Sequence, residues 1–270
     1  LPVLAAGLPA IEVGSFVSPR AVPAMAGAAE VVAGLPVGGA VYSALIPNRK
    51  GYDLATAAGV TQVELVVAAS QTMNRENINA TTEEAMAGCE DIVRAARADG
   101  VKTLACIATA WECPFEGRVD PDVVLSLARD MFAHGADEVV LADTIGAADP
   151  GVVRRLTQIA ADEFGAHRLS CHFHDTRGMG VANVAAALES GIRKFDASIG
   201  GLGGCPFAPG ATGNVATEDV ALMLGQMGFA TGIDLVKLVA AVDLVSELVG
   251  HPQGGHSIRW LRRQIEKGTL

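Results

Sequence analysis

The chain has 270 residues, half of them hydrophobic, and its 20 basic and 30 acidic residues give a formal net charge of −10. No stretch is strongly basic, so we expect neither a nucleic acid nor an anionic membrane as a partner. The five cysteines show no CxxC spacing, the start lacks a signal-peptide pattern and no apolar run reaches about 18 residues, which together predict reduced thiols, a cytoplasmic location and no membrane span.

Short β-rich runs alternate with longer segments whose apolar residues recur at helical spacing. Strands are expected at Ala10–Phe16, Val41–Pro47, Gln62–Ala68, Lys102–Ala108, Glu138–Asp143, Leu169–Asp175 and Lys194–Gly200. Helices are expected at Pro19–Gly34, Gly51–Ala58, Thr82–Ala98, Pro121–His134, Pro150–Phe164, Val181–Ser190 and Thr217–Met227. The runs Thr81-Thr82-Glu83-Glu84 and Asp120-Pro121 are typical helix starts.

This alternation predicts a parallel sheet with helices on its faces. Seven strand–helix units are visible, and Leu1–Gly7 is interpreted as the tail of a helix whose strand precedes the chain. Seven units and one missing unit match a TIM (β/α)8 barrel, whereas no GxGxxG supports a doubly wound sheet. We therefore expect one catalytic barrel domain over residues 1–270 that lacks its first strand, with an extra helix and tail at about 234–270.

An incomplete barrel exposes strand edges and apolar core, so the open position is expected to be covered, for example by a second subunit in a homodimer.

Two histidines, His172 and His174, alternate along one predicted strand and therefore project from the same face. Paired imidazoles can bind a metal, although such a pair on an apolar strand is also commonly structural. Chemistry in a TIM barrel lies at the C-terminal ends of the strands. The polar residues expected there are Glu12, Asn48, Ser70, Glu112, Asp143, His172, His174 and Asp175.

A glycine-dense segment follows the last predicted strand and includes a single thiol, Cys205, before Pro206. Glycine gives such a loop the freedom to close over a site, and a thiol can move a proton. The alternative interpretation is an ordinary loop cysteine.

Several motifs resemble those of 3-hydroxy-3-methylglutaryl-CoA (HMG-CoA) lyases, members of the DRE-TIM metallolyase superfamily. They are Ile11-Glu12-Val13-Gly14-Ser15-Phe16-Val17-Ser18-Pro19-Arg20, Pro47-Asn48-Arg49-Lys50-Gly51-Tyr52, Asn77-Ile78-Asn79, Cys113-Pro114-Phe115-Glu116-Gly117, Asp143-Thr144-Ile145-Gly146, His172-Phe173-His174-Asp175-Thr176 and the run from Gly200 through Cys205 and Asn214 to Asp219. The similarity covers the chain to about residue 250. It implies cleavage of HMG-CoA to acetoacetate and acetyl-CoA.

The resemblance also implies a divalent cation, Mg²⁺ or Mn²⁺, with His172, His174 and Asn214 as ligands. The family further uses an Arg-Asp pair on the first strand, which would precede Leu1. The cleavage is a retro-Claisen reaction, which needs a base for the hydroxyl proton, a cation at the oxygens and protonation of the acetyl-CoA enolate.

The resemblance assigns catalytic roles to Cys205 as a proton donor or base, to Glu12 and Asp143 as acids, and to His172 as a further proton carrier. Glu12 and Asp143 could instead be structural hydrogen-bond acceptors. Cys113 is interpreted as structural. Arg259, Arg262 and Arg263 around Trp260 are interpreted as a solvated helix face, with contact to CoA phosphates or a second subunit as the alternative.

Other functions stay open at this point. The same residues would serve a lyase for citramalyl-CoA or a longer hydroxyglutaryl-CoA. A condensing synthase such as isopropylmalate or homocitrate synthase shares the paired histidines but lacks the cysteine loop, so Cys205 argues against it. A non-catalytic barrel that acts by binding is a third alternative.

Overall fold

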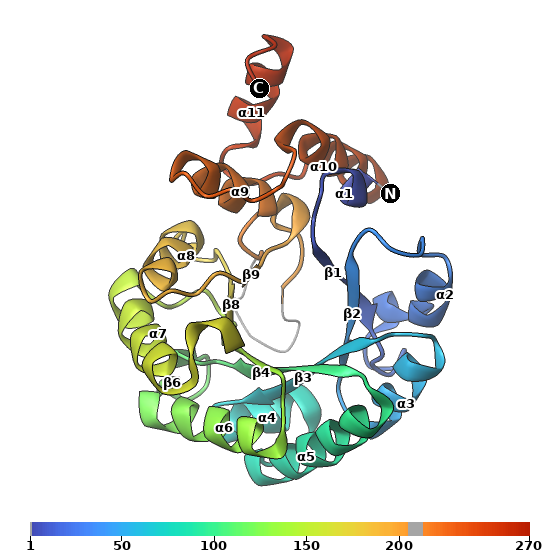
Figure 1. The fold of residues 1–270 in the computed structure, drawn as a ribbon, viewed down its shortest axis with the longest axis vertical. Helices are drawn as coiled ribbons and strands as arrows, with labels where there is room; N and C mark the ends of the chain where they lie inside the picture. The colour runs from blue at the N-terminus through green and yellow to red at the C-terminus, as the bar shows by residue number, and fades with distance from the viewer. Residues whose placement is uncertain (1, 205–212) are drawn as a thin grey trace.

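The computed structural model describes residues 2–204 and 213–270, and within them a seven-stranded parallel sheet curls into an incomplete barrel (Figure 1). The strands are β1 (Ala10–Ser15), β2 (Val41–Ile46), β3 (Gln62–Ala68), β4 (Lys102–Ala108), β7 (Glu138–Asp143), β8 (Leu169–Phe173) and β9 (Phe195–Asp196), in that spatial order. The strands β1 and β9 are the two edges of this sheet, and Figure 1 shows the barrel open between them. The prediction of a TIM-type barrel is therefore confirmed, with seven barrel strands among the described residues.

Helices surround the sheet on its outer side (Figure 1). They are α2 (Ala28–Ala33), α3 (Arg49–Ala57), α4 (Gln71–Ile78), α5 (Thr82–Asp99), α6 (Pro121–His134), α7 (Pro150–Phe164), α8 (Gly180–Glu189) and α9 (Thr217–Gln226). The main core lies between strands and helices, where Leu65, Ile107 and Leu141 are at most 1 % exposed. The predicted starts are confirmed: Thr81 and Glu84 form a capping box on α5, and Asp120 caps α6.

The last predicted strand was wrong in extent, because β9 has only two residues. Gly200 and Gly201 take positive φ angles of 67° and 69°, and Ile199–Gly201 forms a 3-10 turn, η3, which is incompatible with strand pairing. The strand β8 likewise ends at Phe173, and His174 forms an isolated antiparallel bridge with Asn214. Strand geometry thus stops where the candidate site begins.

The helix expected at Pro19–Gly34 is divided into a 3-10 turn, η1 (Pro23–Met25), and the short α2. Gly27 between them has a φ of 86°, which a continuous helix does not allow. Elements without a sequence expectation include α4, a 3-10 turn at Ala166–Arg168 and a two-stranded hairpin, β5 (Glu112–Cys113) and β6 (Gly117–Arg118).

After the barrel, α10 (Leu235–Val249) and α11 (Ile258–Glu266) pack together, and α1 (Pro2–Ala5) lies against α10. The amide of Asp234 donates to the carbonyl of Ala6, which is fully buried with Leu238. No helix in the described part of the chain is long and apolar enough to cross a membrane. The single-domain boundary stays a prediction.

Candidate active site

His172 on β8 and His174, one residue beyond the end of that strand, meet Asn214. The His172 and His174 rings lie with centroids 5.2 Å apart, and His174 is 5 % exposed. Nδ1 of His174 and Oδ1 of Asn214 are buried and have no hydrogen-bond partner among the described residues. Buried polar atoms are rarely left unpaired in native proteins, so an unpaired nitrogen and oxygen at one place indicate a position built for a bound group.

Loss of hydration disfavours the charged form of both imidazoles, and at His172 it outweighs the opposing effect of Asn214. It lowers the pKa of His172 to about 4 and, together with the neighbouring His172, that of His174 to about 4. Both rings are therefore neutral at pH 7, which is the form that ligates metals.

Asn214 is held in place by the backbone around it. Its Nδ2 donates to the carbonyl of Leu202 at 2.7 Å, which leaves Oδ1 as the acceptor atom of its amide. No geometric hydrogen bond reaches Oδ1, although the Asn214 side chain acts to raise the pKa of His172. The preceding Gly213 has a φ of 46°, and a side chain there would meet the carbonyl oxygen of Gly201 at 3.0 Å. The carbonyl of Gly213 also accepts a hydrogen bond from the amide of Asp175. Because position 213 is a glycine, the backbone can adopt the turn that places Asn214 beside the histidines.

Asp143 ends β7 and is 1 % exposed. Its carboxylate accepts hydrogen bonds from the amides of Ala147 at 2.9 Å and Ala148 at 3.1 Å. Burial nevertheless raises its pKa to about 6, against the lowering effect of these two bonds. The geometry gives Asp143 a structural role in the turn, and its catalytic role stays a prediction.

Glu12 is the third residue of β1 and lies below the strand end where sequence analysis had placed it. Two further acidic residues, Glu64 on β3 and Asp196 on β9, act together with it, and neither was among the sequence predictions. The charge of Asp196 acts on Glu12, and the charges of Glu12 and Asp196 act on Glu64. Burial and the charge of Asp196 raise the pKa of Glu12 to about 7. Asp196 is also the strand partner of His172, with its Oδ2 3.8 Å from Nδ1 of the ring.

The remaining predicted strand-end residues have local partners. Asn48 and Ser70 cap α3 and α4, and Glu112 pairs with Arg177 at 3.0 Å. Ser70 also donates to the buried Sγ of Cys113 at 3.0 Å, as expected for a structural thiol.

Asp175 joins the barrel to the segment after α10. Its Oδ1 accepts from the amide of Gly180 at 2.7 Å, and its Oδ2 lies 2.9 Å from Nε2 of His256. Buried Glu218 and Asp219 accept backbone hydrogen bonds from Gly255 and His256 in the same segment. No motif marks His256, so this contact could not be predicted from the sequence.

Cys205 lies outside the described residues, so its position relative to the histidines stays a prediction. No cluster of three His, Cys, Asp or Glu side chains suited to a metal occurs among the residues that are described. The candidate ligand set therefore depends on the amide oxygen of Asn214 beside the two imidazoles.

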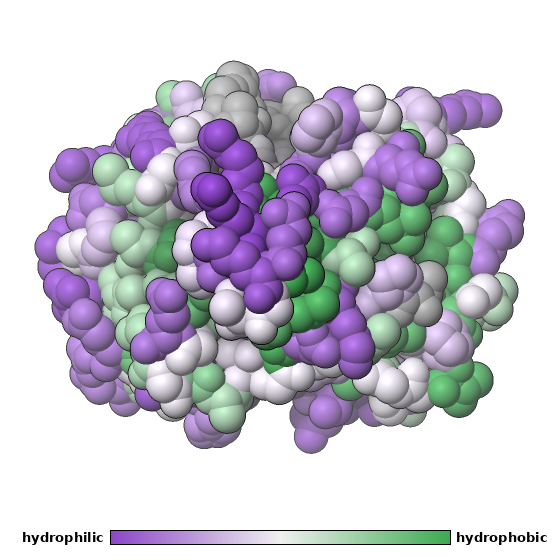
Figure 2. Space-filling model, turned by 90° about the horizontal axis from the view of Figure 1, so that it is seen from above, coloured by the Kyte–Doolittle hydropathy of each residue, from purple (hydrophilic) through white to green (hydrophobic). Residues whose placement is uncertain are grey.

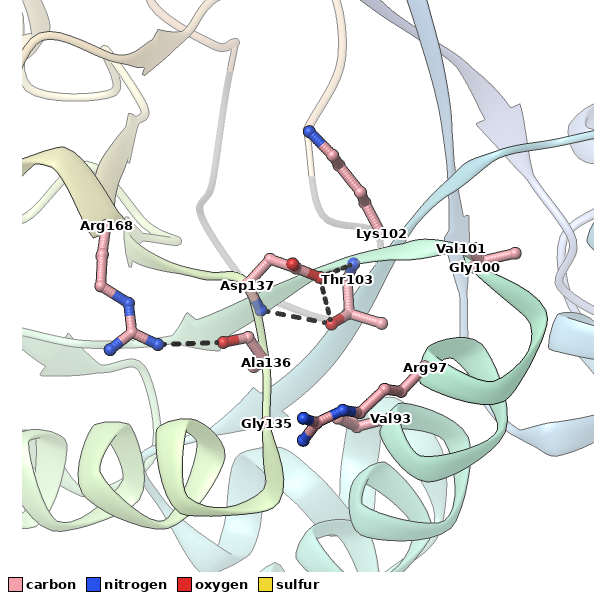
Figure 3. Close-up of a pocket in the computed structure, with 10 residues that line it drawn as sticks. All are labelled: Val93, Arg97, Gly100, Val101, Lys102, Thr103, Gly135, Ala136, Asp137 and Arg168. Atoms are coloured by element: carbon pink, nitrogen blue, oxygen red, sulfur yellow. Dashed lines mark hydrogen bonds between the residues drawn. The ribbon is translucent and has the colours of Figure 1, made fainter.

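A cavity of about 520 Å³ lies near the other end of the barrel (Figure 3). It forms where α5 and α6 end, at Gly100 and Gly135, and where β4 begins. Arg97 and Arg168 lie there beside the negative ends of these helices, which their charges balance. Because catalysis in this fold occurs at the opposite strand ends, the cavity is not the candidate site.

The C-terminal helices form a separate surface. In Figure 2, which views the molecule from that side, hydrophilic side chains stand at the front next to hydrophobic patches. Arg262 pairs with Asp243 at 2.6 Å, and Trp260 is 47 % exposed. The interpretation of this basic segment as a solvated helix face agrees with these contacts.

A family model described as HMGL-like matches residues 3–245. A 3-hydroxy-3-isohexenylglutaryl-CoA/hydroxymethylglutaryl-CoA lyase of Pseudomonas aeruginosa is 44 % identical over 258 residues, 95 % of this chain and 86 % of the relative. An (R)-citramalyl-CoA lyase of Chloroflexus aurantiacus is 43 % identical over 261 residues, 93 % of this chain and 82 % of the relative.

Among solved structures, an HMG-CoA lyase from Acinetobacter baumannii in complex with coenzyme A and 3-methylmalate superposes with a TM-score of 0.92 at 39 % identity, over 96 % of this chain and 85 % of that chain. The carboxyl transferase domain of Rhizobium etli pyruvate carboxylase, at 18 % identity and a TM-score of 0.66, covering 87 % of this chain and 39 % of that chain, shares the fold alone.

Proposed function

The chain belongs to the HMGL-like family of carbon–carbon lyases in the DRE-TIM superfamily, and from this premise we propose that it cleaves HMG-CoA to acetoacetate and acetyl-CoA. The observation that carries the proposal is the pair of buried, unpartnered atoms, His174 Nδ1 and Asn214 Oδ1, beside His172. Two neutral imidazoles and an amide oxygen suit a divalent cation of the Mg²⁺ or Mn²⁺ type.

His172, His174 and Asn214 would hold this cation, and Asp196 would orient the His172 ring from its Nδ1 side. When bound, the cation supplies positive charge to the hydroxyl and carbonyl oxygens of the substrate.

The acids of the chain supply proton transfer. Glu12 has a pKa of about 7, so near neutral pH it can accept the proton of the substrate hydroxyl group. Asp143 keeps its turn closed through two backbone hydrogen bonds and thereby fixes the end of β7. Cys205 is proposed to protonate the acetyl-CoA carbon, and the support for this role is the glycine-dense sequence motif around it.

A second candidate substrate is (R)-citramalyl-CoA, because a lyase of that specificity is almost as similar to this chain as the HMG-CoA lyases are. Both substrates are hydroxyacyl-CoA thioesters that break a carbon–carbon bond next to a hydroxyl-bearing carbon. An acyl-CoA substrate is thus common to both proposals, and a homodimeric, cytoplasmic enzyme stays a prediction.

Steady-state cleavage tests the proposal. The purified protein is assayed with HMG-CoA and with (R)-citramalyl-CoA, in added Mg²⁺ or Mn²⁺ and after chelation. We expect HMG-CoA to give the higher kcat/KM, chelation to abolish turnover and His174→Ala to weaken metal binding. Higher kcat/KM with citramalyl-CoA would select the second candidate, and unchanged turnover in a metal-free preparation would refute the metal assignment.

A further inference from the structure

The interior of the barrel contains a layer that is mostly acidic. The inside of a (β/α)8 barrel is usually filled by layers of four side chains, taken from alternate strands and dominated by branched apolar residues. Here the alternate strands β1, β3, β7 and β9 contribute Glu12, Glu64, Val140 and Asp196. Three carboxyl groups in one such layer have no role in packing a core, so they need a different explanation.

The strand register places Glu12 and Glu64 at one level. Glu12 is opposite Ser43 on β2, and Ser43 is opposite Gln62 on β3. Because the strands of such a barrel tilt, residues at the same height shift by about one position from each strand to the next. From β1 to β3 the shift is about two positions, which brings Glu64 rather than Gln62 beside Glu12. Val63 and Leu65 belong to the core between the strands and the helices, so Glu64, which alternates with them along β3, points into the barrel.

The same shift applies further around the sheet. Glu64 is opposite Leu104 on β4, and Leu104 is opposite Glu138 on β7. Two positions further along β7 is Val140. Val140 is opposite Ser170, and two residues further along β8 His172 is opposite Asp196. The layer therefore closes on β9, the strand that borders the open position.

At this level of the barrel Glu12 and Glu64 are neighbours, and the negative charge of Glu12 raises the pKa of Glu64. A hydrogen bond between two carboxyl groups requires a proton on one of them, because a carboxylate can only accept. Burial is the largest cause that raises the pKa of Glu64 well above its usual range, whereas the pKa of Glu12 rises to about 7. The charge of Asp196 acts on both glutamates. The proton accordingly belongs to Glu64.

We propose that Glu64 is a positioning residue that stays protonated and donates its hydrogen bond to Glu12, which keeps Glu12 as the carboxylate that accepts the substrate hydroxyl proton. The inference rests on the proposed cleavage. In that step the hydroxyl O–H bond breaks and its proton moves to Glu12, while the O–H electron pair forms the ketone of acetoacetate. The electron pair of the broken carbon–carbon bond moves to the acetyl-CoA carbon, which is then protonated.

Two substitutions at one position test this arrangement through the pH profile of kcat/KM. Glu64→Gln keeps a donor to Glu12 and should leave the midpoint of the acid limb unchanged. Glu64→Val removes the donor and should move the midpoint upward by about one pH unit, the size expected for one lost hydrogen bond to a charged group. Glu163→Gln, on the exposed surface beside Arg129, is the matched control and should change neither.

A downward shift in Glu64→Gln would mean that a negative charge had been removed, so Glu64 would be ionised and the inference overturned. An unmoved limb in Glu64→Val would overturn it as well.

A titration that does not depend on catalysis separates this inference from the proposed function. In protein labelled with ¹³C at the glutamate carboxyl carbons, the resonance absent from Glu64→Gln should remain that of a protonated acid while the resonance absent from Glu12→Gln titrates. Ionisation of Glu64 at or below the Glu12 midpoint overturns the inference. The expected titration without lyase activity would reject only the proposed function.

Discussion

His172 on β8 and Asp196 on β9 face each other as strand partners, and Nδ1 of the imidazole lies 3.8 Å from Oδ2 of the carboxylate. With Nδ1 turned to Asp196, Nε2 is the ring nitrogen available to a cation. A carboxylate behind a ligating histidine orients the ring and increases its basicity. The relationship also connects the acidic layer of the barrel interior to the candidate ligands.

Asp196→Asn should weaken binding of Mn²⁺ by about 10–100-fold, the usual cost of removing such an orienting group. Isothermal titration of Mn²⁺ into the two proteins measures the effect. Asp162→Asn, an exposed carboxylate beside Gln158, serves as the control and should bind as the unsubstituted chain does. Equal affinities in all three proteins would exclude His172 or its orientation from the metal site.

Asp143→Asn should lower the free energy of unfolding by about 1–3 kcal/mol, because one of two backbone amides would face an NH₂ group instead of an oxygen. Urea unfolding at a pH above the pKa of the Asp143 carboxyl group measures this free energy. The dependence of the free energy on urea concentration should be the same in both proteins. If stability is unaffected while turnover falls, Asp143 acts in the reaction and not in the turn.

The buried imidazole of His174 should make stability fall on acidification. Its pKa is lowered from 6.5 to about 4, so the unfolded chain binds more protons between these values, and the contribution of His174 is complete above about pH 6.5 and lost as pH falls toward 4. Measured in metal-free protein, the stability difference between the wild type and His174→Phe should therefore shift in favour of the phenylalanine variant at low pH. A difference independent of pH would show that His174 is not held neutral.

Cys205→Ser should reduce turnover by roughly 10²–10⁴-fold if the thiol carries a proton. The other four cysteines are buried, so alkylation of the native protein should modify Cys205 first and abolish activity. Cys113→Ser is the matched control: it alters a thiol that is hydrogen-bonded in the core, so stability should respond more than turnover. Near-normal turnover in Cys205→Ser would favour the synthase branch of the superfamily.

The sequence predicted β3, β4, β7, α6 and α7 with their exact bounds, because apolar runs, caps and glycines agree there. It failed at β9, where positive φ angles at two glycines end a strand that β-rich residues would otherwise extend. It missed α4, whose residues lack an apolar stripe even though Ser70 caps it. Local pattern decides an element only where no turn conformation competes with it.

The candidate ligands could be anticipated because alternation along one strand is a local property, as for His172 and His174. Glu64 and Asp196 could not, since an acid inside a strand acquires its neighbours only through the register of strands far apart in sequence. His256 reaches Asp175 through a segment that follows the barrel, a contact that no spacing reveals.

The contact of α1 with α10 has a consequence for how the chain reaches its native state. The hydrogen bond from Asp234 to Ala6 joins the first described turn to one of the last helices, so it can form only after nearly all of the intervening chain is available. Such non-local contacts make folding slow, and α1 must wait unpaired while the barrel strands assemble. Until α10 has been synthesised, the apolar surface that α1 shares with it stays exposed, and such surface promotes association with other nascent chains.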